Sequence, residues 1–226
     1  SPLRQQKLTM SALVIVRVPY ALSYRDEARI YGKLVAGAPA FRDVHLDPHA
    51  LPLAAVFAIL TRLVRPEREG LDLTRKLRLY AGEAVEGFPE SGGPRLHHEA
   101  ADEGLFGVSS RFVINAISNA ITRSDARSLT SMELLLALKD AIESDARMDA
   151  RQKKAWIDHL VVARKDFYNR WVKEDVHRAL FASFEGEAQQ LLEKYLDEVE
   201  AGRDAREVKD PITGETRPAD ERFLRA

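Results

Sequence analysis

Cysteine is absent from all 226 residues of the sequence. Its absence excludes disulfide bridges, thiolate metal sites and a cysteine nucleophile. A chain that forms no disulfides suits a reducing compartment, so we expect it in the cytoplasm.

Excess charge of one sign and long apolar runs are also missing. The sequence has 34 Lys and Arg against 35 Asp and Glu, so the chain as a whole has no field that would recruit nucleic acid or an anionic membrane. The longest uncharged apolar stretch, residues 48–61, has 14 residues, fewer than the roughly 18 to 20 needed to cross a bilayer. We therefore expect neither a membrane nor nucleic acid as a partner.

Motifs for phosphate transfer are absent too. A P-loop needs Gly-x4-Gly-Lys-Ser/Thr, and the Gly-Lys pair of this chain, Gly32-Lys33, is followed by Leu34. The sequence also has no Gly-rich kinase loop, no His-Arg-Asp catalytic loop and no Asp-Phe-Gly, so nothing places magnesium or a phosphate-transfer base. We predict no catalytic residues in this chain.

The remaining composition is that of an ordinary globular protein, with 45% hydrophobic residues, 12 Gly and 10 Pro. Apolar residues recur at helical spacing over most of the chain, which predicts a mainly α fold. One N-terminal strand is predicted at residues 12–18, where β-branched residues end at Pro19, and a small turn or hairpin at residues 210–215. Helices are expected at residues 23–37, 47–64, 71–80, 110–121, 130–142, 149–170 and 172–199, packed as a helical array.

Side chains that cap helices support several of these starts. Ser23 is followed by Asp26 in the spacing of a capping box, and Ser109 can cap the helix that begins at residue 110. Asp47 is the expected N-cap of the second helix, with Pro48 at its first position. That helix is apolar nearly all round, so we expect it to be buried.

Several local clusters have both a functional and a structural interpretation. We interpret the cations at residues 62–78 as a solvated face rather than a contact with phosphate or an acidic protein. We interpret the aromatics of the C-terminal helices as helix-packing residues rather than a platform for base stacking. Adjacent His97 and His98 favour a solvated loop over a metal site, so we expect no metal. His159 and His177 are assigned no role. The cations are Arg62, Arg65, Arg68, Arg75, Lys76 and Arg78, and the aromatics are Phe167, Tyr168, Trp171, Phe181 and Phe184.

The strongest candidate site is the segment Asp102–Arg111. Its glycines give a flexible approach to a capped helix start, and an arginine in a first turn can present its guanidinium to a phosphate. The candidate cofactor-binding residues are Gly107, Ser109, Ser110 and Arg111. The structural alternative is that the glycines only make turns, Ser109 is only a cap, and Arg111 pairs with a carboxylate of Asp102, Glu103 or Asp125.

Six short segments follow one another in the order Val16-Arg-Val-Pro-Tyr20, Arg29-Ile-Tyr31, Arg78-Leu-Tyr-Ala-Gly-Glu83, Asp102-Glu-Gly104, Gly107-Val-Ser-Ser-Arg111 and Asp210-Pro-Ile-Thr-Gly-Glu215. Together they resemble the PrkA family of bacterial serine protein kinases, which join an AAA+ ATPase module to a distinctive C-terminal region. The resemblance runs from about Leu13 to the C-terminus. The sequence departs from the family at Ser11-Ala12, where the family has Asp-Arg, and Ser1–Met10 shows no likeness.

The resemblance implies a fragment that lacks the Walker motifs. It divides the chain into a remnant of the AAA+ core strand at residues 1–22, a lid-like helical domain at 23–125 and the helical start of the C-terminal region at 126–226. It also matches Arg111 to the sensor-2 arginine, which reaches from an AAA+ lid to the nucleotide phosphates. ATP and Mg are implied for the full-length family, and none is expected for this chain alone.

The first hypothesis is therefore a nucleotide-sensing lid and regulatory helical region that is inactive alone and needs the AAA+ core of a longer polypeptide. A non-enzymatic helical protein-interaction module is the alternative, and an AAA+ remodelling or protease-like role is a second one. The protein substrate is not identified by the sequence. We expect a monomer or a weak homodimer.

Overall fold

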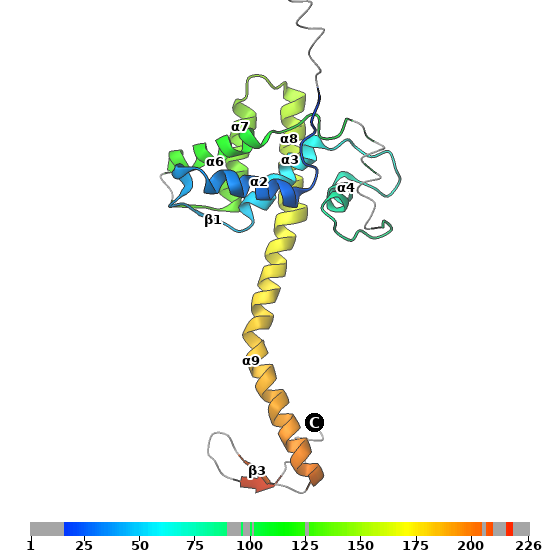
Figure 1. Cartoon of the computed structure of the whole chain (residues 1–226), viewed down its shortest axis with the longest axis vertical. Coiled ribbons are helices and arrows are strands. Elements are labelled where there is room, and N and C mark those ends of the chain that lie inside the picture. The colour runs from blue at the N-terminus through cyan, green and yellow to red at the C-terminus, as the bar shows by residue number, and fades with distance from the viewer. Residues whose placement is uncertain are drawn as a thin grey trace, which may run out of the picture. The chain divides into compact units, whose positions relative to one another are not determined.

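The computed structural model describes residues 16–89, 96, 100, 102–124, 127–204, 207–209 and 216–218. By packing, the chain divides into two compact units, residues 1–171 and 172–226. Helices dominate the described residues (Figure 1), which confirms the predicted mainly α class. Within the described part of the chain, no helix is both long and apolar enough to cross a membrane.

The first unit contains most of the helices. They are α2 (Tyr24–Ala36), the short 3₁₀ helix η1 (Pro39–Phe41), α3 (Ala50–Arg62), α4 (Leu73–Tyr80), α6 (Ser110–Ser124), α7 (Ser131–Ser144), α8 (Ala150–Val162) and the π-helix η2 (Ala163–Tyr168). Two short strands, β1 (His45–Leu46) and β2 (Ser128–Leu129), pair in parallel and join the approaches to α3 and α7.

Helix α3 forms the centre of this unit. Every residue from Leu53 to Leu60 is buried, as expected for a helix that is apolar on all sides, and α2, α4, α6, α7, α8 and η2 all contact it. Helix α2 lies across it (Figure 1), with Tyr24, Glu27 and Tyr31 on its buried face. Burial of this one helix therefore organises the positions of its neighbours.

The predicted cap of α3 is wrong. The helix begins at Ala50, two residues later than Pro48, and His49 occupies the N-cap position without a side-chain bond to the helix. Asp47 instead accepts the His49 backbone N–H at 2.8 Å and the Ser131 backbone N–H at 3.2 Å. Its carboxylate thus joins the start of α3 to the start of α7, a long-range contact that local spacing does not reveal.

Other helix starts agree with the sequence. Ser23 accepts the Asp26 N–H, and Ser109 accepts the Phe112 N–H. Thr130 and Glu133 form a reciprocal capping box at the start of α7. Each of these bonds lies within a few residues in sequence, which explains why spacing alone predicts them.

The predicted N-terminal strand is not formed in its described part. Val16–Val18 lie outside any strand, and the remainder of the 12–18 segment lies outside the described residues. A strand needs a partner to satisfy its backbone groups, and none of the described strands pairs with this segment. Near the other end, β3 (Glu207–Lys209) and β4 (Thr216–Pro218) pair antiparallel, which confirms the predicted hairpin, although its turn at 210–215 lies outside the described residues.

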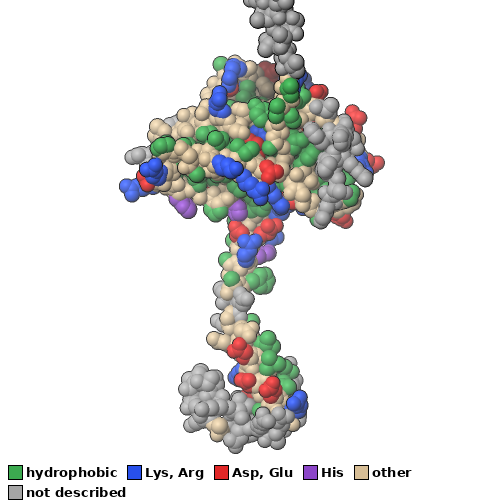
Figure 2. Space-filling view, viewed as in Figure 1, with side chains coloured by type: hydrophobic (Ala, Val, Ile, Leu, Met, Phe, Trp, Pro, Cys, Tyr) green, Lys and Arg blue, Asp and Glu red, His purple; other side chains and the backbone are tan. Residues whose placement is uncertain are grey.

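The long helix α9 (Asn169–Asp204) continues into the second unit, where it does not pack as the sequence suggests. Phe181 and Phe184 are 76% and 58% exposed, so the predicted packing role is wrong for them within the described structure. Figure 2 shows apolar side chains exposed on this helix. Phe167, which is fully buried, and Trp171, which packs against the core of the first unit, do follow the prediction.

Candidate functional site

The candidate segment runs along the C-terminal end of α3. Gly104 donates its N–H to the Arg62 carbonyl at 3.3 Å, and its own carbonyl accepts the Tyr20 N–H at 2.8 Å. The segment therefore lies between the end of α3 and residues 19–21, which lead into α2. These contacts bring together parts of two of the motifs that carry the family resemblance.

Gly107 makes the closest approach to α3. A Cβ built on it would lie 2.7 Å from the Thr61 carbonyl oxygen and 2.8 Å from Arg62 Cγ, and its φ is +108°. Thr61 secures the same place, since its hydroxyl accepts the Val108 N–H at 2.9 Å and donates to the Ala58 carbonyl at 2.7 Å. Only glycine fits this backbone without displacing α3.

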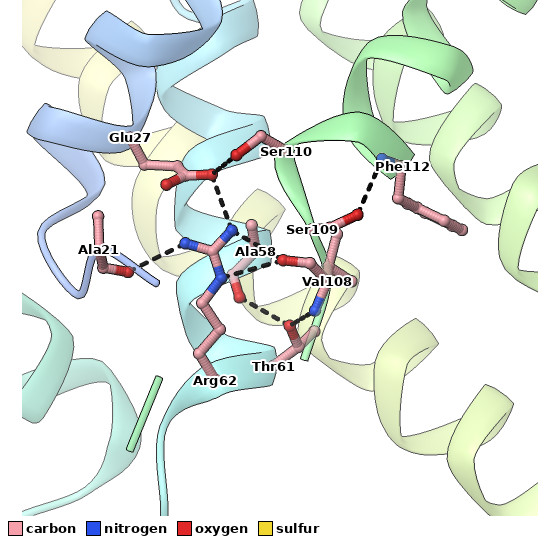
Figure 3. Close-up of polar contacts among 9 residues, drawn as sticks. All are labelled: Ala21, Glu27, Ala58, Thr61, Arg62, Val108, Ser109, Ser110 and Phe112. Carbon is pink, nitrogen blue, oxygen red and sulfur yellow. Dashed lines mark hydrogen bonds and ion pairs between the residues drawn. The ribbon is translucent and has the colours of Figure 1, made fainter. Parts of the chain in front are cut away.

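Arg62, the last residue of α3, is the centre of a buried polar cluster (Figure 3). Its side chain is 0% exposed, and Nη2 pairs with Glu27 Oε1 at 2.7 Å. Nε and Nη2 donate to the Val108 carbonyl at 3.0 and 2.7 Å, and Nη1 donates to the Ala21 carbonyl at 3.0 Å. One guanidinium therefore binds three segments that are distant in sequence.

Ser109 and Ser110 fix the start of α6. The Ser109 hydroxyl accepts the Phe112 N–H at 3.3 Å, which is the N-capping role that the sequence predicts. The Ser110 hydroxyl donates to Glu27 Oε1 at 2.8 Å, so the carboxylate that pairs with Arg62 also holds the first turn of α6. A direct contact of Gly107, Ser109 or Ser110 with nucleotide stays a prediction.

Arg111 follows in this first turn and is exposed. Among the described residues, its side chain forms no hydrogen bond, ion pair or ring contact. Of the partners that the structural alternative named, Glu103 is engaged by Lys76 and Tyr80, Asp102 does not pair with Arg111, and Asp125 lies outside the described residues. Among the described residues, the ion pair that the structural alternative requires is therefore not formed.

The electrostatics of the cluster keep Glu27 ionised. Burial opposes its charge, but the hydrogen bond and the positive charge of Arg62, with the Ser110 hydroxyl, outweigh burial and hold the pKa of Glu27 below its ordinary value. The neighbouring Tyr31 behaves oppositely, because burial and the Glu27 charge raise the pKa of its phenol. Glu27 therefore stays ionised at neutral pH.

Two further carboxylates, those of Glu103 and Glu83, bond α4 and the turn after it to other parts of the first unit. Glu103 pairs with Lys76, accepts the Tyr80 hydroxyl at 2.5 Å and accepts the Val64 N–H at 2.9 Å.

Glu83 accepts the Tyr24 hydroxyl at 2.7 Å and Arg78 Nε at 2.8 Å. Burial opposes its charge, yet Arg78 and the Tyr24 hydroxyl hold the pKa of Glu83 below its usual range. These bonds connect α4 and the turn after it to α2.

The predicted solvated face at residues 62–78 is therefore wrong for two of its cations. Arg62 and Lys76 are buried and paired, with 0% and 4% of their side chains exposed. Glu27 and Arg62 were not candidate site residues, because no spacing links positions 35 apart. The sequence did contain one indication: Arg62 ends a helix that is apolar nearly all round and expected to be buried, and a buried charge needs a partner.

No metal centre emerges from the part of the chain that the structure describes. Its His, Asp and Glu residues form no group of three or more that would hold an ion. His97 and His98, interpreted from sequence as a solvated loop, lie outside the described residues.

Comparisons with known proteins add two family matches. Residues 74–226 match a model described as the PrkA serine protein kinase C-terminal domain, and residues 4–70 match one described as the PrkA AAA domain. Together the two matches include all the segments that carry the family resemblance.

The names of two relatives describe different activities. The "ATP-dependent protease PrkA" of Bacillus subtilis (strain 168) is 38% identical over 216 residues, which is 96% of this chain and 34% of that protein. The "Serine/threonine kinase YeaG" of Escherichia coli (strain K12) is 24% identical over 210 residues, which is 91% of this chain and 32% of that protein. The chain thus spans about a third of the length of these relatives. No solved structure matches it.

Proposed function

Because the chain belongs to the PrkA family, we propose that it is the nucleotide-sensing lid and regulatory helical region of an ATP-dependent serine protein kinase of the AAA+ class. Arg111 is the phosphate-sensing residue. The observation that carries this proposal is the exposed Arg111 guanidinium, without a partner among the described residues, at the start of a helix whose first turn is bonded to a buried ion pair.

The nucleotide itself is bound by an AAA+ core that supplies the P-loop. This chain has none, and its buried cations Arg62 and Lys76 are already paired with carboxylates. Arg111 fits the remaining task of a single cation that meets a phosphate from outside the core. ATP with Mg is therefore the cofactor of the longer polypeptide, and we expect no binding to this chain alone.

The two alternatives receive less support. A stand-alone interaction module does not explain why matches to both an AAA domain and a kinase C-terminal domain extend along this chain. One relative is named a protease and another a kinase, so the lid role of this chain is proposed for either reaction of the longer protein, with the kinase as the first candidate. We keep the division at residues 1–22, 23–125 and 126–226 as its domain scheme.

Binding of Mg-ATP to a longer polypeptide with its AAA+ core tests the role of Arg111. A charge-assisted hydrogen bond contributes about 1.5–3 kcal/mol, so Arg111→Ala should weaken binding about ten- to a hundredfold. Arg29→Ala is the matched control, because Arg29 is an exposed arginine of the same unit that pairs only locally with Asp26. Equal affinity of wild type and Arg111→Ala would contradict the proposal.

Helix α9 supports the regulatory part of the proposal. Large apolar side chains are exposed along its second-unit portion, including Leu191 and Tyr195, and clustered exposed apolar side chains are typical of protein contacts. We expect weak self-association through this face. Sedimentation over a concentration series should show a dimer that Phe181→Ser with Phe184→Ser abolishes, and a chain that is monomeric throughout would contradict this part.

A further inference from the structure

The buried cluster around Arg62 connects the segment that precedes α2 to the helix that carries Arg111. The Arg62 guanidinium donates to the Ala21 carbonyl on one side and to the Val108 carbonyl on the other. The Tyr20 ring stacks on the same guanidinium, 4.6 Å from centroid to Cζ. A displacement of residues 20–21 must therefore move or break contacts of Arg62.

Two backbone hydrogen bonds also link the segment before α2 to Arg62, through Gly104. The Tyr20 N–H donates to the Gly104 carbonyl at 2.8 Å, while the Gly104 N–H donates to the Arg62 carbonyl at 3.3 Å. The segment before α2 is thus bonded to the side chain of Arg62 and to the loop that Arg62 supports.

The path reaches Arg111 through Glu27. Its Oε1 is shared by Arg62 Nη2 at 2.7 Å and by the Ser110 hydroxyl at 2.8 Å (Figure 3). Ser110 is the first residue of α6 and adjoins Arg111. The contacts therefore run from Ala21 through Arg62 and Glu27 to the residue before the candidate phosphate sensor.

Stability alone does not account for this arrangement. Replacing a buried ion pair by apolar residues of similar volume is often neutral or stabilising, so fold energy gives little reason to retain one. Charged groups add directional hydrogen bonds, since a guanidinium donates in a fixed planar pattern and a carboxylate oxygen can accept from two donors. Here these hydrogen bonds link α2, α3, the first turn of α6 and the segment before α2.

We infer that Arg62 and Glu27 are positioning residues for Arg111, and that they transmit movements of residues 20–21 to the first turn of α6. The inference rests on the proposed function, because it supplies the regulation of that same arginine. The segment before α2 lies within the residues that match the PrkA AAA domain and in the part that we assign to the AAA+ core strand, so movement of the core reaches the sensor through this cluster.

Hydrogen exchange on the 226-residue chain tests the positioning without nucleotide. Tyr20→Leu should raise exchange of the Phe112 and Val113 amides several-fold, although Tyr20 makes no bond to α6. Ser110→Ala should do the same. Two matched controls should leave these amides unchanged: Val18→Ala, which alters an exposed neighbour of Tyr20, and Thr122→Ala, whose hydroxyl bonds only within α6. Unchanged exchange in Tyr20→Leu would overturn the inference.

A double-mutant cycle in the longer protein separates this inference from the proposed function. If Arg111 binds phosphate and Ser110 positions it, Ser110→Ala weakens Mg-ATP binding about two- to tenfold with Arg111 present and leaves it unchanged in the Arg111→Ala background. Equal effects in both backgrounds overturn the positioning while Arg111 keeps its role. If Arg111→Ala has no effect, the proposed function fails, and the exchange experiment alone decides whether the cluster positions α6.

Discussion

Removing the carboxylate of Glu27 should strongly destabilise the first unit. Glu27→Ala leaves the Arg62 guanidinium with its charge unpaired, and the two side chains are 1% and 0% exposed. Breaking one partner of a buried pair costs about 3–5 kcal/mol. The carbonyls of Ala21 and Val108 still accept from Arg62, so we expect the lower end of this range.

Thermal unfolding followed by circular dichroism measures this cost. For a unit of about 150–250 residues, each kcal/mol lowers Tm by about 2–4 °C, so Glu27→Ala should lower it by roughly 6–12 °C. Asp26→Ala is the matched control, because the neighbouring Asp26 makes an exposed ion pair with Arg29 that contributes at most about 1 kcal/mol. A loss of Tm in Glu27→Ala no larger than in Asp26→Ala would refute the buried cluster.

Three further predictions concern the same unit. Gly107→Ala should cost at least about 2 kcal/mol in urea unfolding, since its Cβ meets α3, whereas Gly87→Ala, at φ +81° with open space around it, should cost only about 1 kcal/mol. Because the pKa of Glu27 is lowered by folding, its contribution is present above the unfolded pKa of about 4.3 and is lost as pH falls through the folded value, so acid unfolding curves of Glu27→Gln should show a smaller loss than wild type. Tyr24→Phe removes one hydrogen bond to Glu83 and should lower the free energy of unfolding by about 1 kcal/mol, measured from urea midpoints. An unchanged midpoint would show that this bond does not stabilise the fold.

The helices were predictable because their signals are local. Periodic apolar residues and caps such as Ser23 and Ser109 act within a turn or two, and the structure confirms both. The Asp47 cap failed for the opposite reason: its carboxylate bonds to Ser131, 84 positions away. The paired strands β1 and β2 were missed likewise, because two residues in each leave no alternating pattern to detect.

The candidate site was only half visible in the sequence. The motif that ends at Arg111 showed a capped helix start, and the structure places that arginine at the surface as the phosphate-sensing hypothesis requires. The partners that hold the turn were hidden, because Arg62 belongs to a run of cations that looks solvated and Glu27 lies on another helix. Exposure of Phe181 could not be foreseen either, since helical spacing identifies an apolar face but not what covers it.

A calorimetric titration of this chain with Mg-ATP, in wild type and in Arg111→Ala, tests most directly whether Arg111 needs a separate core. We propose that Arg111 meets a nucleotide bound by a core that supplies the P-loop, a motif that this chain lacks. We therefore expect no binding heat for either protein, while a longer polypeptide with the AAA+ core binds under the same conditions. Binding by the 226-residue chain that Arg111→Ala abolishes would contradict this proposal, because the chain would then hold a phosphate site of its own.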